Sequence, residues 1–157
     1  PEDIMFIAKW KMGLVEFEGA RAVREEVFVA EQGVPYDEEF DSFDGISFHL
    51  YITTEEGLPI AAARIHPEGN NTAIGRIAVI KQFRNAGYEE FALRMLLFKA
   101  QNLAGERITT LAPASGRELY ERFGFRADGD TESIRNSEYV RMSVGRDEIT
   151  WFSQCRH

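Results

Sequence analysis

The residues best placed to do chemistry form a short loop between a predicted strand and a predicted helix. The stretch from Ile74 to Leu103 reads IGRIAVIKQFRNAGYEEFALRMLLFKAQNL, and its loop is Arg84-Asn85-Ala86-Gly87-Tyr88. A helix that begins after such a loop directs the N–H groups of its first turn, and the positive end of its dipole, at one point. That point suits a phosphate or a pyrophosphate, so the loop predicts an anion site.

The elements that must position this loop can be read from the apolar pattern. Short apolar runs predict strands at residues 4–10, 47–54, 59–66, 72–80, 107–112, 125–128 and 138–145, the second and third joined through Glu55-Glu56-Gly57. Helical spacing predicts helices at 20–32 and 88–104, and Gly105 fits the C-terminal cap of the latter. Ser115-x-x-Glu118 predicts a capping box that opens a helix ending at Gly124. Residues 36–45, which are acidic and aromatic, predict a loop.

Composition limits the possible functions. The chain has 157 residues, which predicts one domain spanning residues 1–157, and its 44% apolar and 12% aromatic content describes a soluble globular protein. A formal net charge of −8 without a Lys/Arg cluster argues against a nucleic-acid partner. The chain carries no apolar run of membrane-spanning length and no cleavable signal, so no membrane association is expected. A single cysteine, Cys155, excludes an intrachain disulfide and favours a cytoplasmic location.

Four sets of residues resemble one known family. The Arg84-x-x-Gly87 spacing is similar to the acetyl-CoA loop Arg/Gln-x-x-Gly-x-Gly/Ala of the GNAT superfamily of N-acetyltransferases, and Tyr120-x-x-x-Gly124-Phe125 resembles its Y-x-x-x-G-F motif. Residues 23–35, VREEVFVAEQGVP, resemble the first helix of the ElaA-like subgroup, R-x-x-V-F-V-x-E-Q, and so do His49-Leu50 and Ala63-Arg64-Ile65 on later strands. The predicted order of elements is also the GNAT order.

This resemblance implies a fold and a cosubstrate. The fold would be α/β (α+β): a central mixed, mostly antiparallel sheet flanked by helices, with splayed fourth and fifth strands. Backbone groups of Ile77, Ala78 and Val79 would hold the pantetheine arm of acetyl-CoA, and the loop Arg84-Asn85-Ala86-Gly87-Tyr88-Glu89 would hold its pyrophosphate. No metal is implied.

The resemblance also implies an enzyme, an N-acetyltransferase that transfers acetyl from acetyl-CoA to a primary amine by direct attack. Tyr120 would be the general acid that protonates the leaving thiolate; the alternative is an aromatic side chain packed on a helix face. The sequence identifies no general base, although Glu26, Glu31, His49 and His66 are candidates.

The acceptor side is predicted from charge. Glu26 and Glu31 lie on the first helix, and Asp37 and Glu38 belong to a loop, residues 36–44, with five carboxylates and three aromatic side chains. Such a loop would attract a cationic amine, although a solvated acidic turn is the equally strong alternative. A small amine, a peptide N-terminus and a lysine side chain fit alike. The oligomeric state stays open, a homodimer included.

Two departures from the family pattern leave alternatives open. Glu89 stands where the family has a small residue facing the pyrophosphate, and Pro113 stands about where the family often has Asn. The chain could therefore be a catalytically impaired GNAT-fold module that binds CoA or regulates. The Arg-x-x-Val-Phe helix and the acidic loop also resemble acyl-homoserine lactone synthases, although the chain is shorter and the Arg84 and Tyr120 motifs fit the ElaA-like subgroup better.

Overall fold

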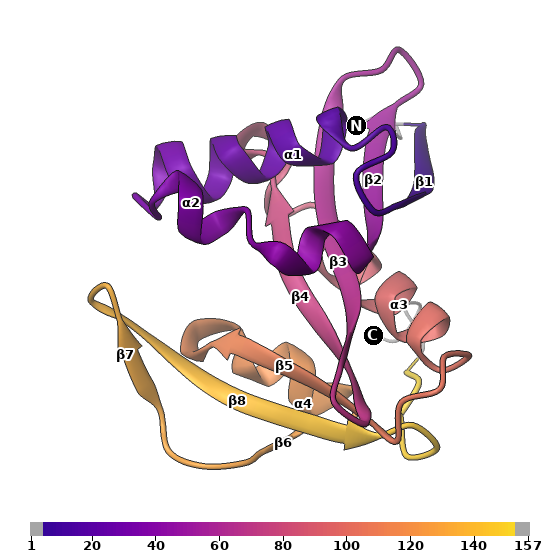
Figure 1. Cartoon of the computed structure of the whole chain (residues 1–157), viewed down its shortest axis with the longest axis vertical. Coiled ribbons are helices and arrows are strands. Elements are labelled where there is room, and N and C mark those ends of the chain that lie inside the picture. The colour runs from indigo at the N-terminus through magenta and orange to yellow at the C-terminus, as the bar shows by residue number, and fades with distance from the viewer. Residues whose placement is uncertain (1–4, 153–157) are drawn as a thin grey trace. The chain divides into compact units, whose positions relative to one another are not determined.

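Eight strands and several short helices alternate along the chain in the computed structural model, which describes residues 5–152 (Figure 1). The strands are β1 Phe6–Met12, β2 Phe48–Thr54, β3 Pro59–Glu68, β4 Asn71–Val79, β5 Arg107–Pro113, β6 Arg126–Ala127, β7 Glu132–Ile134 and β8 Ser137–Gly145. The α-helices are α1 Glu18–Arg24, α2 Tyr36–Glu39, α3 Tyr88–Ala100 and α4 Arg117–Arg122. A π-helical segment, η1 Glu25–Glu31, continues α1, and 3₁₀ turns cover η2 Ser42–Ile46, η3 Lys81–Phe83 and η4 Ala114–Gly116.

The strands form a mostly antiparallel sheet, which confirms the predicted fold class. The chain divides into two compact units, each described here by itself. One comprises the described residues up to His66 together with Arg76–Phe98, and the other comprises Pro67–Gly75 and the described residues from Lys99 onward.

The first unit is built on the strand order β1-β2-β3-β4. Leu50 lies opposite Trp10 on β1 and Ala63 on β3, and its side chain is fully buried. The predicted β2–β3 hairpin is confirmed, since the Thr54 N–H bonds the Leu58 carbonyl at 2.9 Å. Helix α1 buries Ala20 and Val23, and it packs so closely on β2 that a Cβ atom at Gly19 would overlap the Tyr51 ring.

The second unit carries the order β4-β5-β8-β6, with β7 paired to the N-terminal end of β8. Strands β5 and β8 are antiparallel from Arg107 opposite Gly145 to Pro113 opposite Tyr139. The parallel ladder between β4 and β5 is short, with Thr72 opposite Ile108 and Ala73 opposite Thr109. This short ladder agrees with the predicted divergence of these two strands.

Two helix predictions were wrong in their extent. Residues 20–32 do not form one α-helix, because the chain widens into the π-helical η1, where the Gln32 N–H bonds the carbonyl of Val27, five residues back, at 3.2 Å. Helix α3 ends at Ala100 rather than at 104. Gly105 is therefore not its cap; a Cβ atom there would lie 2.6 Å from the backbone nitrogen of Thr72, so close approach of two chain segments requires glycine.

Three local predictions also failed. Ser115 and Glu118 form no capping box, since α4 begins at Arg117 after Gly116 and no side chain caps it. Residues 36–45 are not a plain loop but contain α2 and most of η2. Strand β7 was missed; it joins β8 through Arg135-Asn136, a two-residue turn with both φ angles positive (50° and 66°). Cys155 lies outside the described residues.

Candidate functional site

The loop before α3 has the backbone geometry of an anion site. Gly87 (φ 89°) is the residue before the helix, and its carbonyl accepts the N–H of Phe91 at 3.0 Å. The N–H groups of the first helical turn therefore have no carbonyl one turn back within the helix. Asn85 also has a positive φ, 63°. Left-handed residues in a loop turn successive N–H groups toward one concave face, a common arrangement around phosphates.

Arg84, whose side chain is exposed, links this loop to two other segments of the first unit. Its Nε donates to the carbonyl of Val79 at 2.8 Å, and its Nη2 lies 2.7 Å from Glu31 Oε1 at the end of η1. The hydrogen bond from Arg84 lowers the pKa of the Glu31 carboxyl. The structure thus brings Arg84 together with two other predicted site residues: Glu31, from the predicted acceptor side, and Val79, from β4.

The remaining loop residues differ in exposure. Tyr88 is buried and meets the rings of Phe6 and Phe83 edge to face, at 5.6 and 6.1 Å between centroids. Ala86 is exposed, as are Asn85 and Gly87. Glu89 is exposed in the first turn of α3, and it forms no ion pair with any residue that the structure describes. An acidic side chain there interacts favourably with the helix dipole and unfavourably with a bound phosphate.

The second half of β4 lies beside the loop in sequence and is held in place from both sides. Ala78 and Val79 are buried, while Ile77 is half-buried. The N–H of Ile80 bonds the carbonyl of Ile60 on β3 at 2.8 Å. Because Arg84 occupies the Val79 carbonyl, this strand end and the loop are fixed to each other.

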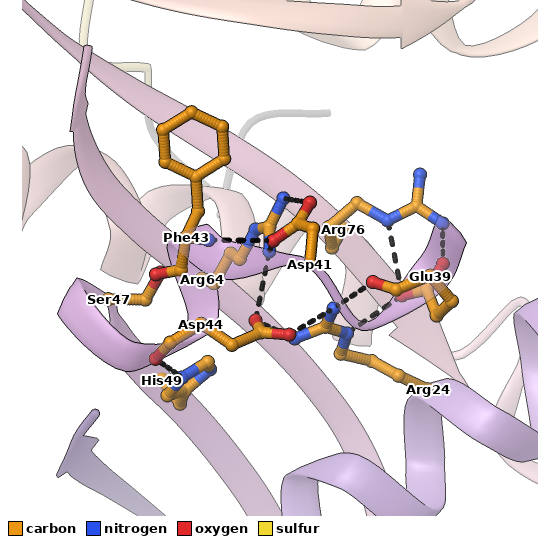
Figure 2. Close-up of polar contacts among 9 residues, drawn as sticks. All are labelled: Arg24, Glu39, Asp41, Phe43, Asp44, Ser47, His49, Arg64 and Arg76. Atoms are coloured by element: carbon orange, nitrogen blue, oxygen red, sulfur yellow. Dashed lines mark hydrogen bonds and ion pairs between the residues drawn. The ribbon is translucent and has the colours of Figure 1, made fainter. Parts of the chain in front are cut away.

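A buried network of charges underlies this part of the first unit (Figure 2). Arg24, on α1, is fully buried; its Nε donates to Glu39 Oε2 at 2.8 Å and its Nη1 to Asp44 Oδ1 at 2.7 Å. Arg64, on β3, donates through Nη1 to Asp44 Oδ1 at 2.9 Å and to Asp41 Oδ1 at 2.8 Å. Arg24 and Arg64 therefore both pair with carboxylates in the interior of this unit.

Arg76, on β4, completes this network. It forms a two-point ion pair with Glu39 through Nε and Nη2, and its guanidinium lies over the Phe28 ring, 3.9 Å from the centroid. The cluster now contains three arginines and three carboxylates, so its formal charge is zero. We call these six residues the charge network: Arg24, Glu39, Asp41, Asp44, Arg64 and Arg76.

Burial and charge shift the pKa of two groups in and beside the network. Burial would raise the pKa of Asp41, but the hydrogen bonds and positive charge of Arg64 outweigh it and lower that pKa. Burial lowers the pKa of His49, and the charges of Arg24 and Arg64 lower it further. His49 Nε2 lies 3.0 Å from the Asp44 carbonyl, while its buried Nδ1 has no hydrogen-bond partner.

The network changes what the acidic loop can do. Glu39 and Asp44 are buried and Asp41 is only partly exposed, so three of the five carboxylates there already neutralise arginines. Asp37 and Glu38 are exposed, as is Glu26 on η1. Sequence reasoning missed Glu39 and Arg76 as a pair. The only available signal was an arginine on a strand otherwise free of charge.

Tyr120 belongs to the second unit. It is buried on α4, and its ring meets Phe125 edge to face with centroids 5.5 Å apart. The N–H of Phe125 bonds the Tyr120 carbonyl at 3.2 Å. Between them Gly124 has a φ of 101°, and a Cβ atom there would lie 3.0 Å from the Glu148 carbonyl. The Tyr-x-x-x-Gly-Phe spacing therefore has a packing explanation in this unit, and the general-acid role stays a prediction.

The other candidate bases are also placed by the structure. His49 is fully buried against the ring of Phe17, 4.4 Å away. His66 is buried and stacks on Phe43 with centroids 4.0 Å apart.

Within residues 5–152 no three His, Cys, Asp or Glu side chains form a metal-binding group. In the same residues no helix is long and apolar enough to span a membrane.

Comparison with known proteins identifies the family of this chain. Residues 18–125 match the model of the acetyltransferase (GNAT) family. A Bacillus subtilis (strain 168) protein named uncharacterized N-acetyltransferase YjcF is 30% identical over 112 residues, covering 71% of this chain and 79% of that relative.

Two solved structures share the architecture. An acyl-CoA N-acyltransferase from Pseudomonas aeruginosa aligns with a TM-score of 0.74 and 23% identity, over 90% of this chain and 99% of its own. Escherichia coli ElaA aligns with a TM-score of 0.75 and 19% identity, over 87% of this chain and 99% of its own. Identities this low show a shared fold alone, whereas the family match covers most of the chain and every predicted site residue. The chain therefore belongs to the acetyltransferase (GNAT) family.

Proposed function

We propose that the protein is an acetyl-CoA-dependent N-acetyltransferase that acetylates a primary amine by direct attack. The observation that carries this proposal is the loop before α3, where Gly87 precedes the helix and left-handed Asn85 helps turn N–H groups toward one face. In a member of this family, such donors suit the pyrophosphate of an acyl-CoA. The backbone of Ile77–Val79 is the proposed seat of the pantetheine arm.

The proposed reaction needs little from side chains. The amine nitrogen bonds to the thioester carbonyl carbon as the carbon–sulfur bond breaks, and Tyr120 Oη passes its proton to the leaving sulfur. A cationic acceptor first gives one proton to water, because only the neutral amine has a lone pair for the attack. After the attack the nitrogen releases a further proton to water, and water returns one to Tyr120. The protein contributes mainly proximity and orientation, with backbone N–H groups stabilising the developing negative charge on oxygen.

The acceptor is proposed to be a small-molecule or peptide amine. Asp37 and Glu38 are the exposed carboxylates of the acidic loop, and Glu26 is exposed on the preceding η1. These three exposed side chains, rather than the buried charge network, would attract a cationic acceptor. Glu31 is the weaker candidate, because it already pairs with Arg84.

A second candidate function has two observations in its favour. The exposed Glu89 has no cation to neutralise it among residues 5–152, and Arg84 is already engaged by Glu31 and the Val79 carbonyl. Both features weaken binding of a pyrophosphate. The alternative is therefore a GNAT-fold module that binds CoA weakly, or not at all, and regulates rather than catalyses.

Calorimetric titration with acetyl-CoA, CoA and pantetheine tests the proposal. We expect micromolar binding of both CoA forms and at least about tenfold weaker binding of pantetheine, which lacks the pyrophosphate. A panel of primary amines should then release free CoA thiol from acetyl-CoA. Absence of binding at millimolar acetyl-CoA would contradict the enzyme assignment, and tight binding without turnover on any amine would favour the regulatory module.

A further inference from the structure

Strand β4 contains a residue in a backbone conformation that a strand rarely allows. Arg76 has a φ of 51°, in the left-handed region, directly before Ile77–Val79. Residues with a Cβ atom avoid this region, and such conformations persist only where surrounding contacts over-determine them. The conformation of Arg76 sets the direction in which the next peptide groups point.

The contacts that hold Arg76 come from one side chain and one ring. The Glu39 carboxylate accepts hydrogen bonds from Nε and Nη2 of Arg76. The ring of Phe28, on η1, lies against the guanidinium, with 3.9 Å from Cζ of Arg76 to the ring centroid. Figure 2 shows the Arg76 guanidinium facing the Glu39 carboxylate, with its second terminal nitrogen directed away from it. A planar guanidinium that is paired at two points and stacked has little freedom to rotate.

Glu39 is itself fixed by a fully buried partner. Arg24 donates from Nε to Glu39 Oε2 and from Nη2 to the Glu39 backbone carbonyl, both at 2.8 Å. Both of these side chains have no solvent exposure, whereas the Arg76 side chain is 32% exposed. The pair therefore presents a carboxylate of fixed position to a strand residue at the edge of the network.

We propose that Arg24 and Glu39, acting through Arg76, are positioning residues for acyl-CoA. They hold Arg76 left-handed and thereby aim the peptide groups of Ile77–Val79 at the acyl-CoA arm. This inference rests on the proposed function for its ligand. It gives the charge network a task at β4, because a network that served stability alone would not need a left-handed arginine.

The test exploits the difference between alanine and glycine at this position. Arg76→Ala removes the holding contacts but keeps the Cβ atom, so the left-handed conformer becomes about tenfold less populated than the competing conformer. Arg76→Gly removes the same contacts but adopts positive φ about as readily as negative φ. Because apparent affinity scales with the competent fraction, we expect Kd for acetyl-CoA to rise about tenfold in Arg76→Ala and about twofold in Arg76→Gly.

A matched control is available in the second unit. Arg135 has nearly the same φ, 50°, in the turn between β7 and β8. Arg135→Ala and Arg135→Gly should both bind acetyl-CoA like wild type, even if their melting temperatures differ. Glu39 is left unchanged in this series, because its loss would leave the buried Arg24 with Asp44 as its remaining carboxylate partner and destabilise the protein for an unrelated reason.

Two readouts keep this inference separate from the proposed function. Backbone amide chemical shifts of Ile77, Ala78 and Val79, measured without ligand, should move in Arg76→Ala and return toward wild-type values in Arg76→Gly. Unmoved shifts in Arg76→Ala would overturn the inference whether or not acyl-CoA binds. Equal acetyl-CoA affinities of the alanine and glycine variants would also overturn it. If the two variants show the expected amide shifts but the wild type binds no acyl-CoA, only the proposed function and its ligand are overturned.

Discussion

Glu89 gives the sharpest test of how this chain handles a pyrophosphate. The side chain is exposed in the first turn of α3 and has no ion pair among the described residues. Replacing it with glycine removes the charge and the Cβ atom together, whereas replacing it with glutamine removes only the charge. We expect acetyl-CoA to bind about tenfold more tightly to Glu89→Gly, and Glu89→Gln to recover part of that gain.

The magnitude follows from Coulomb's law. A carboxylate about 6 Å from a phosphate costs roughly 3 kcal/mol at an effective dielectric of about 20. Solvent and salt reduce this to about 1–2 kcal/mol at an exposed site, and about 1.4 kcal/mol is tenfold in affinity. Arg84 offsets little of this cost, because its guanidinium already serves Glu31 and the Val79 carbonyl. Glycine within a helix costs up to about 1 kcal/mol, which lowers stability without opposing the ligand.

Calorimetry at low and at high salt measures the effect, and Glu90 provides the control. Glu90 lies in the same turn but pairs with Arg94 at 3.4 Å, so Glu90→Gln should change acetyl-CoA affinity less than Glu89→Gln. The Glu89 gain should shrink as salt rises, since exposed charges are screened beyond about 8–10 Å. Equal affinities for wild type and both Glu89 variants at low salt would refute the reasoning and show that this carboxylate does not face the ligand.

Three further predictions concern catalysis, the acceptor and acid stability. Tyr120→Phe removes only the proposed proton donor, so turnover should fall at least about tenfold with acetyl-CoA affinity unchanged; equal turnover, where chemistry limits the rate, would remove the general-acid role. Replacing Asp37 and Glu38 by their amides should raise KM for cationic amines far more than for acetyl-CoA, and less so at high salt; a protein that uses only neutral or anionic acceptors would contradict this. Because burial lowers the folded pKa of His49 below its usual value near 6.5, stability should fall as pH drops below about 6.5, by up to about 1.4 kcal/mol per pH unit. Urea unfolding between pH 7.5 and 5 gives the free energy of unfolding at each pH, and this free energy should depend less steeply on pH in His49→Gln than in wild type. An unchanged pH dependence would show that another group titrates there.

The fold was predictable where local signals and burial agree. Strand β3 is one such element, since Ile60–Ile65 are all buried and all apolar except Arg64. Elements set by longer-range contacts were not predictable. Gly105 was interpreted as a helix cap because its neighbours in sequence fit one, yet a chain segment around Thr72 is what requires it. The π-helical η1 has no sequence signature separate from that of an α-helix.

The candidate site divides in the same way. The loop Arg84–Tyr88 could be located from spacing alone, because its geometry depends on adjacent residues and on the helix that follows. The pairing of Glu39 with Arg76 could not, since these residues are far apart in sequence and their charges look like those of any solvated loop and strand. Only the three-dimensional structure shows which carboxylates of the acidic loop are already neutralised.

This neutrality bears on how an acceptor would be recognised. Each buried carboxylate of the charge network faces at least one guanidinium, as Glu39 faces Arg24 and Asp44 faces Arg64. Oppositely charged neighbours at this distance cancel each other's field over a few ångströms, so the network cannot steer a cation from solution. Long-range attraction is left to the exposed Asp37 and Glu38, while the buried pairs fix local geometry. Acceptor affinity should therefore depend on salt and on those two exposed carboxylates, whereas the alignment of β4 should depend on the buried ones and respond little to salt.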